Sequence, residues 1–218
     1  MNRRDFILSA AIAGAAGLAG TQAIAQKSPA ASSQTVLVVG DSLSAEYGLK
    51  RGEGWVALLE KRLAEQKIAA RVVNASISGE TSAGGRSRIE ALLKQSKPDL
   101  VVIELGANDA LRGLPVAQTQ DNLAAIVNAA KLVNAKVLLV GIQVPPNYGM
   151  AYLNSFSKVF SSIGTLSKVP VVPFMLRNVA DGPDAATMFQ ADRIHPVAAA
   201  HPRILDNIWP ELKKLLLK

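Results

Sequence analysis

The sequence contains no cysteine, which excludes disulfide bonds, thiolate nucleophiles and metal sites built on cysteine. Histidine is scarce, with two in 218 residues, and aromatic residues make up only 5% of the chain. Basic residues exceed acidic ones by a net charge of +7, but they are scattered, as on an ordinary solvated surface. A basic patch with interleaved aromatic residues, typical of nucleic-acid binding, is missing. The chemistry must therefore come from hydroxyl, carboxyl and amide groups and two imidazoles.

The N-terminal 25 residues are predicted to be a bacterial export signal rather than part of the fold. Arg3 and Arg4 precede an apolar run rich in alanine and glycine, and small residues at 23–25 suit a signal peptidase. Paired arginines indicate the twin-arginine type, with the Sec route left as the alternative. The run falls short of the roughly 20 apolar residues that a membrane anchor needs. We expect cleavage near Ala25, a periplasmic or secreted enzyme, a flexible lead-in over 26–34 and one domain over 35–218.

Short β-branched runs alternate with helical patterns along the rest of the chain. Strands are predicted at 35–39, 71–74, 100–105, 136–140 and 169–172, and helices at 55–66, 86–94, 123–133, 150–166 and 204–217. Buried strands that alternate with helices predict an α/β fold, a three-layer α/β/α sandwich around a mainly parallel five-stranded sheet. Ligands of such sheets bind beyond the carboxyl ends of the strands. Functional groups are therefore sought where each strand ends.

Ser42 follows the first predicted strand directly, in the segment Gly-Asp-Ser at 40–42. Such residues are often only turn and cap residues, but a serine there is also placed as a nucleophile. Of the two histidines, His195 has Asp192 three residues before it, a spacing at which the carboxylate can accept a hydrogen bond from the ring. His201 has no such neighbour and is expected to be a surface or locally hydrogen-bonded residue near a helix start. A Ser42–His195–Asp192 triad is therefore predicted.

Polar segments also follow the second and third predicted strands. Gly79 lies in the segment 78–80, and Asn108 lies in the segment 106–109. A glycine N–H and an asparagine amide are suitable donors to the oxyanion of an acyl-transfer reaction. Either segment alone could be an ordinary loop, but three successive strand ends carrying such groups favour an active site.

Four short blocks resemble the SGNH (GDSL) hydrolase family in order: Gly-Asp-Ser at 40–42, Gly79, Gly-x-Asn-Asp at 106–109 and Asp-x-x-His at 192–195. The segments 74–81, 104–109 and 145–149 are most similar to its bacterial periplasmic branch of acyl-CoA thioesterases, lysophospholipases and arylesterases. The resemblance covers nearly all of the expected mature chain. It implies the flavodoxin-like form of the sandwich and no metal or organic cofactor.

The resemblance also implies a role for each matching residue. Ser42 is the nucleophile, His195 the general base and Asp192 its orienting carboxylate. The backbone N–H groups of Ser42 and Gly79 and the amide of Asn108 donate to the oxyanion.

Residues implied to contact substrate are Asp109, Ala110, Leu111, Pro146 and Tyr148. Three departures from the family pattern, Glu46, Ala110 and Arg193, each replace a common glycine. They bear on substrate preference and entrance charge and remove no catalytic group.

The predicted function is a serine esterase that hydrolyses carboxylic esters or thioesters through an acyl-enzyme on Ser42. Aryl esters, short- to medium-chain acyl esters and lysophospholipids are the expected substrates. A carbohydrate O-acetyl esterase of the same superfamily and a non-catalytic lipid-binding envelope protein are the alternatives. The expected partner is a small-molecule ester, with transient lipid contact possible and no nucleic acid or stable protein partner implied.

Overall fold

A computed structural model of the chain describes residues 33–144 and 148–217. The predicted export signal at 1–25, the lead-in up to residue 32 and Pro146 lie outside these described residues.

The centre of the domain is a sheet of five parallel strands in the order β2-β1-β3-β4-β5. The strands are β1 (Gln34–Gly40), β2 (Ala70–Asn74), β3 (Leu100–Glu104), β4 (Lys136–Val140) and β5 (Val171–Val172). Every residue of β3 is buried, whereas the edge strand β2 is mostly half-buried, which reflects their places in the sheet. The predicted parallel five-stranded sheet is confirmed.

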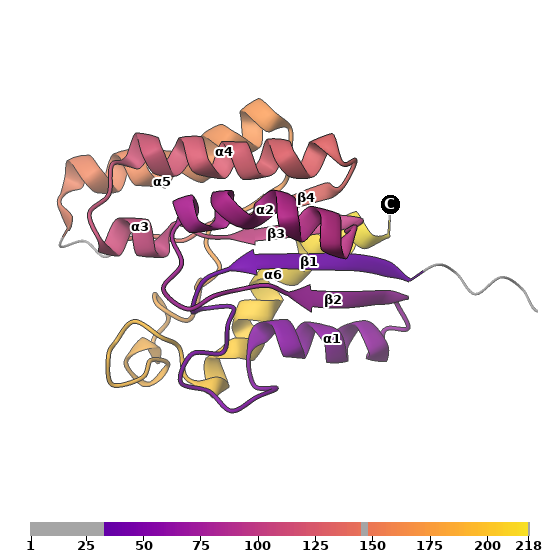
Figure 1. The fold of residues 1–218 in the computed structure, drawn as a ribbon. Helices are drawn as coiled ribbons and strands as arrows, with labels where there is room; N and C mark the ends of the chain where they lie inside the picture. Colours follow the sequence, from indigo (N-terminus) through magenta and orange to yellow (C-terminus); the bar gives the residue numbers. More distant parts are fainter. Residues whose placement is uncertain (1–32, 145–147, 218) are drawn as a thin grey trace, which may run out of the picture. The chain divides into compact units, whose positions relative to one another are not determined.

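Helices cover both faces of the sheet, which makes the predicted three-layer sandwich (Figure 1). The helices are α1 (Trp55–Glu65), α2 (Ser82–Ser96), α3 (Ala107–Leu111), α4 (Val116–Leu132), α5 (Met150–Ser167) and α6 (His201–Leu216). Helices α2, α4 and α5 pack side by side on one face, and α1 packs against α6 on the other (Figure 1). This arrangement buries a single apolar core around the sheet.

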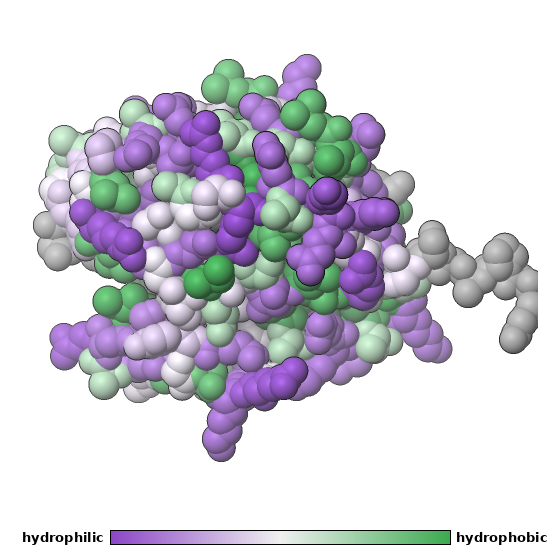
Figure 2. Space-filling view, in the orientation of Figure 1, coloured by the Kyte–Doolittle hydropathy of each residue, from purple (hydrophilic) through white to green (hydrophobic). Residues whose placement is uncertain are grey.

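Polar residues cover most of the visible outer surface, with separate apolar patches between them (Figure 2). None of the helices described in residues 33–144 and 148–217 has both the length and the apolar character of a membrane-spanning segment.

Three helix starts differ from the sequence prediction. Helix α2 begins four residues early, where Thr81 caps it by accepting a hydrogen bond from the Gly84 N–H at 3.3 Å. Helix α4 begins at Val116, directly after Pro115, although its first two turns are largely polar. Helix α6 begins at His201, three residues early, and the short helix α3 lies where the sequence predicts no helix. In each case the local apolar period is too weak to mark the first turn.

Strands β1 and β3 lie side by side in the sheet. The chain leaves β1 toward β2 on one side of this pair and leaves β3 toward β4 on the other side. This is the switch point at which parallel sheets of this order form a ligand crevice. Ser42 follows β1 and Asn108 follows β3, so both lie at this crevice.

Candidate active site

Ser42, His195 and Asp192 form a hydrogen-bonded chain across 153 residues of sequence. The Ser42 Oγ lies 2.8 Å from the His195 Nε2, and the His195 Nδ1 lies 2.7 Å from the Asp192 Oδ2. With the ring proton on Nδ1, the imidazole donates to the carboxylate and accepts from the serine hydroxyl. The geometry is that of a nucleophile, its base and an orienting carboxylate.

The loop that carries Asp192 is shaped around this carboxylate. Its Oδ1 accepts the backbone N–H groups of Ile194 at 2.9 Å and His195 at 3.0 Å. The hydrogen bond from the His195 side chain, followed by these two N–H bonds, lowers the pKa of Asp192 to about 2. The carboxylate is therefore ionised at neutral pH and can stabilise a protonated imidazole.

Two residues that the sequence reading missed fix the position of His195. The ring of Tyr47 lies against the imidazole, with ring centroids 4.2 Å apart. The Gln190 backbone N–H donates to the His195 carbonyl at 2.8 Å, and its side-chain amide donates to the Tyr47 carbonyl at 2.9 Å. Gln190 thereby joins the loop after β1, which carries Ser42 and Tyr47, to the loop that carries His195. Neither residue stands in a recognisable motif, so only the three-dimensional structure reveals them.

His201 differs from the prediction of a surface or locally bonded residue. It does begin helix α6, but it is 2% exposed, and its Nδ1 accepts the backbone N–H of Trp55 at 3.0 Å. Burial lowers the pKa of His201, which favours the neutral ring that this acceptor role requires. The imidazole therefore joins the start of α1 to the start of α6 and has a structural role.

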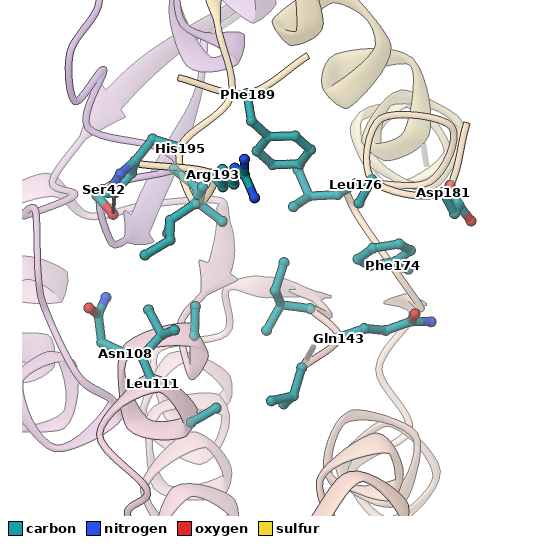
Figure 3. Close-up of a pocket in the computed structure, with 17 residues that line it drawn as sticks. Ser42, Asn108, Leu111, Gln143, Phe174, Leu176, Asp181, Phe189, Arg193 and His195 are labelled. Carbon is teal, nitrogen blue, oxygen red and sulfur yellow. Dashed lines mark hydrogen bonds between the residues drawn. The ribbon is translucent and has the colours of Figure 1, made fainter. Parts of the chain in front are cut away.

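Two of the residues predicted to donate to the oxyanion, Ser42 and Asn108, line the cavity, and Gly79 lies in the loop that follows β2. The backbone N–H groups of Ser42 and Gly79 have no acceptor among the described residues, although other turns of the domain are bonded. Gly79 has a φ of 79°, a left-handed conformation that glycine adopts without strain. Asn108 lines the pocket opposite Ser42, with its amide on the serine side (Figure 3). These groups are suitable donors to a developing oxyanion.

Asp41 supports the candidate site, although the sequence analysis assigns it no role beyond its place in the Gly-Asp-Ser segment. It is fully buried, and its Oδ2 accepts the Asn108 side-chain amide at 3.1 Å, while its Oδ1 accepts the Leu43 N–H at 3.0 Å. One carboxylate thus orients the Asn108 amide and shapes the loop that carries Ser42. The signal in the sequence is an acidic residue directly after a strand that is otherwise apolar.

A second buried carboxyl, Glu104, lies behind Asp41. The Ser44 hydroxyl donates to its Oε2 at 2.6 Å, and the Trp55 indole N–H donates to the Ser44 oxygen at 3.1 Å. A β-carbon on Gly40 would lie 2.8 Å from both Glu104 and Ser44, so crowding rather than a special φ requires glycine there. Burial and the neighbouring charge of Asp41 raise the pKa of Glu104 well above its ordinary value.

The stability of the domain should depend on pH through Asp41, whose pKa is raised by burial from 3.8 to about 6. Between these values the folded state binds a proton that the unfolded chain has already released. The Asp41 contribution to the free energy of unfolding therefore rises as the pH falls through 6. Unfolding in urea at pH 7 and at pH 5 should show wild type gaining about 1 kcal/mol over Asp41→Asn on acidification.

Comparison with Asp41→Asn at each pH removes the groups that do not sense Asp41 from the difference, whereas Glu104, whose pKa the Asp41 charge raises, contributes to it together with Asp41. The pKa values of His201 and Asp192 are both lowered in the folded state, so each makes the free energy of unfolding smaller as the pH falls. This effect is the same in wild type and in Asp41→Asn. A difference between the two proteins that is constant from pH 7 to pH 5 would contradict a raised pKa of Asp41.

The triad opens onto a cavity of about 620 Å³. Its lining is mostly apolar and comes from the ends of β1, β3 and β4 and from the segment 174–195: Leu43, Ala107, Ala110, Leu111, Ile142, Val144, Phe174, Leu176, Ala180, Phe189 and Ile194. The polar lining residues are Ser42, Asn108, Gln143, Asp181, Arg193 and His195. Figure 3 shows Ser42 and His195 together at one side of this cavity. Such a lining suits the apolar part of an ester.

The predicted substrate contacts divide into two groups. Ala110 and Leu111 line the cavity, where they could contact an ester. Asp109 does not, which corrects the prediction: it is 1% exposed and accepts hydrogen bonds from the Ser82 N–H at 2.8 Å and the Thr119 hydroxyl at 3.2 Å. Its carboxylate points into the α2–α4 interface, so it has no surface to offer a substrate.

Tyr148, Glu46 and Arg193 were expected to affect substrate contact or the charge at the pocket entrance. Tyr148 is half-buried and lies outside the lining, with its hydroxyl 3.5 Å from the Leu111 carbonyl. Glu46 does not face the entrance, because its Oε1 accepts the N–H groups of Gly52 at 3.0 Å and Gly54 at 2.8 Å. Its role is to close the loop before α1. Arg193 does line the cavity.

No cluster of three or more histidine, cysteine or acidic side chains suited to a metal ion occurs within the part of the chain that the structure describes.

Comparison with known proteins agrees with this geometry. The model of the GDSL-like lipase/acylhydrolase family matches residues 38–203, from β1 to α6. The chain belongs to this family. It is therefore a serine hydrolase that acts on ester bonds, which sets aside the non-catalytic alternative.

Curated members of the family extend the similarity over most of the chain. Esterase TesA of Pseudomonas aeruginosa is 54% identical over 199 residues, covering 91% of this chain and 98% of the relative. Thioesterase 1/protease 1/lysophospholipase L1 of Escherichia coli K12 is 41% identical over 187 residues, covering 86% and 87%.

Solved structures of this family also match the fold. A crystal structure of TesA has a TM-score of 0.80 at 56% identity, covering 84% of this chain and 99% of that one. The esterase EstA from Pseudoalteromonas sp., solved with monoethylphosphonate as inhibitor, has a TM-score of 0.79 at 42% identity, covering 85% and 100%.

Replacing Asn108 by alanine should lower kcat by about 10²–10³-fold, because one oxyanion donor is lost. The change also removes a donor to the buried Asp41, so the free energy of unfolding should fall by about 1 kcal/mol. Steady-state kinetics per mole of folded protein separates the two effects. A variant that keeps its full kcat per folded molecule would show that Asn108 is structural only.

Proposed function

We propose that this hydrolase cleaves short- to medium-chain carboxylic esters and thioesters, with the acyl chain in the apolar cavity. The observation that carries the proposal is the Ser42–His195 hydrogen bond at the edge of that cavity. The names of its relatives, esterase, thioesterase and arylesterase, support the same class of substrate.

The reaction follows from the geometry in two steps. Ser42 attacks the ester carbonyl while the His195 Nε2 accepts its proton, and Asp192 stabilises the imidazolium that forms. The Ser42 and Gly79 N–H groups and the Asn108 amide donate to the carbonyl oxygen as it becomes negative. His195 then gives the proton to the departing alcohol or thiol. A water molecule activated by the same imidazole releases the acid from Ser42.

A panel of p-nitrophenyl esters of increasing acyl length tests this substrate class. We expect kcat/KM to rise with chain length while the chain fits the cavity, because each buried methylene adds apolar contact. An acetylated sugar is the comparison substrate. Preference for the sugar acetate over every longer acyl ester would instead favour a carbohydrate O-acetyl esterase.

We also propose that the protein works outside the cytoplasm, in the periplasm or the medium, with residues 1–25 as a twin-arginine signal. The support is Arg3-Arg4 before the apolar run and the small residues at 23–25. Replacing both arginines by lysine should leave unprocessed precursor inside the cell. Continued processing in that variant would point to the Sec route.

A further inference from the structure

Among the described residues that line the cavity, Arg193 is the one with a cationic side chain. In Figure 3 its guanidinium lies between His195 and Phe189, which line the same cavity. Its side chain makes no hydrogen bond or ion pair with any residue of 33–144 or 148–217. A guanidinium without a protein partner beside an apolar cavity is free to bind an anion from outside.

Asp181, the acidic residue of the lining, makes no ion pair with Arg193. Asp181 lies at the far side of the cavity in Figure 3, and its Oδ1 accepts the backbone N–H of Asn178 at 2.5 Å. The nearest catalytic carboxylate, Asp192, is held by the His195 ring and by the backbone of its own loop. The positive charge of Arg193 therefore stays available at the cavity.

The position of Arg193 indicates which half of the ester it faces. His195 must reach the oxygen of the departing alcohol in order to protonate it, so that side of the cavity holds the alcohol half. Arg193 is two residues before His195 in the same turn, where its backbone N–H donates to the Gln190 carbonyl at 2.9 Å. The apolar lining from Ile142, Phe174 and Leu176 remains for the acyl chain.

We infer that Arg193 is a specificity residue that binds an anionic group, phosphate or carboxylate, on the alcohol half of the ester. This inference rests on the proposed function and names the substrate class within it. The guanidinium forms paired hydrogen bonds with either anion, so both share the same recognition chemistry. The enzyme then prefers anionic esters over neutral ones with the same acyl chain.

Two pairs of substrates with equal acyl chains test the inference at low ionic strength. The phosphate pair is monohexanoylglycerol phosphate and monohexanoylglycerol, and the carboxylate pair is para-butyryloxybenzoate and its methyl ester. The quantity measured is the ratio of kcat/KM for the anionic ester to that for its neutral partner. Selectivity in only one pair would identify which anion the site takes.

Arg193→Gly is the central variant, because the φ of 58° at this position suits glycine and the fold should tolerate it. We expect it to lower the anionic-to-neutral ratio by about tenfold, through the anionic ester alone, as expected for a charge-assisted hydrogen bond that is partly exposed. Arg193→Lys should keep most of the ratio. Arg177→Gln, which removes the same charge from an exposed residue outside the lining, should leave the ratio unchanged.

The outcomes separate the inference from the function on which it rests. Equal loss on both members of a pair in Arg193→Gly would make Arg193 structural and overturn the inference alone. An equal drop of the ratio in Arg177→Gln would assign the effect to the net charge of the protein and also overturn it. Failure of wild type to hydrolyse any of the four esters would overturn the proposed function as well.

Discussion

Ser42→Ala is expected to remain folded and to lose about 10⁴–10⁶-fold in kcat. The hydroxyl lies 2.8 Å from the His195 Nε2 and makes no other recorded hydrogen bond within the described residues, so its removal costs the fold little. The nucleophile itself is lost, whereas the oxyanion donors and the cavity remain. Substrate binding should therefore survive, and the defect should lie almost entirely in kcat.

Labelling with an alkyl phosphonate gives an independent measurement of the same prediction. Wild type should gain one phosphonyl group at Ser42, and Ser42→Ala should gain none. Ser78 is an exposed serine in the loop after β2, so the Ser78→Ala variant serves as the control and should be labelled as wild type is. Labelling at another serine, or wild-type turnover in Ser42→Ala, would refute the assignment of the nucleophile.

Replacement of the two histidines is expected to affect different properties, turnover for His195 and stability for His201. His195→Ala should lose nearly all turnover, about 10⁴-fold or more, and should lose less stability than His201→Ala, because the ring faces the cavity and its partners Ser42 and Asp192 can bind water once it is gone. His201→Ala should keep kcat within a few-fold and lose about 1–3 kcal/mol of unfolding free energy, since it leaves the buried Trp55 N–H without its acceptor. Kinetics and urea unfolding on both variants measure the contrast.

Asp192→Asn should lie between wild type and His195→Ala in rate. The asparagine can keep the His195 ring in place but lacks the charge that stabilises its protonated form. If His201→Ala proved inactive and His195→Ala active, the hydrogen-bonded chain to Ser42 would not be the catalytic one.

The architecture could be read from the sequence because its signals are local. A strand such as β3 is apolar at nearly every position and is bounded by turn residues, and its parallel neighbours follow from the alternation with helices. The meeting of Ser42 and Asn108 at one place could be predicted for a related reason. Parallel strands deliver their carboxyl ends to one edge, so residues just after β1 and β3 must meet there.

The parts that could not be predicted depend on contacts between distant segments. The role of His201 is decided by Trp55, 146 residues away, and no local pattern records that contact. Asp109 follows Asn108 directly, yet the start of α3 turns the two side chains to opposite sides, one to the cavity and one into the α2–α4 interface. Neighbours in a motif therefore do not share a function.

The ends of the domain lie at one end of the sheet, and the active site lies at the other. The Gln34 side chain, at the amino end of β1, donates to the Leu216 carbonyl near the end of α6 at 2.9 Å, whereas Ser42 follows the other end of a strand of seven residues. Such a strand spans roughly 20 Å. A tether, tag or solid support joined at either end of the domain is thus held away from the substrate entrance, and an immobilised enzyme should keep free access for its esters. The same proximity of the ends makes the domain suitable for circular permutation, with a short linker from 216 to 34 and new ends at an exposed turn such as the one after α4.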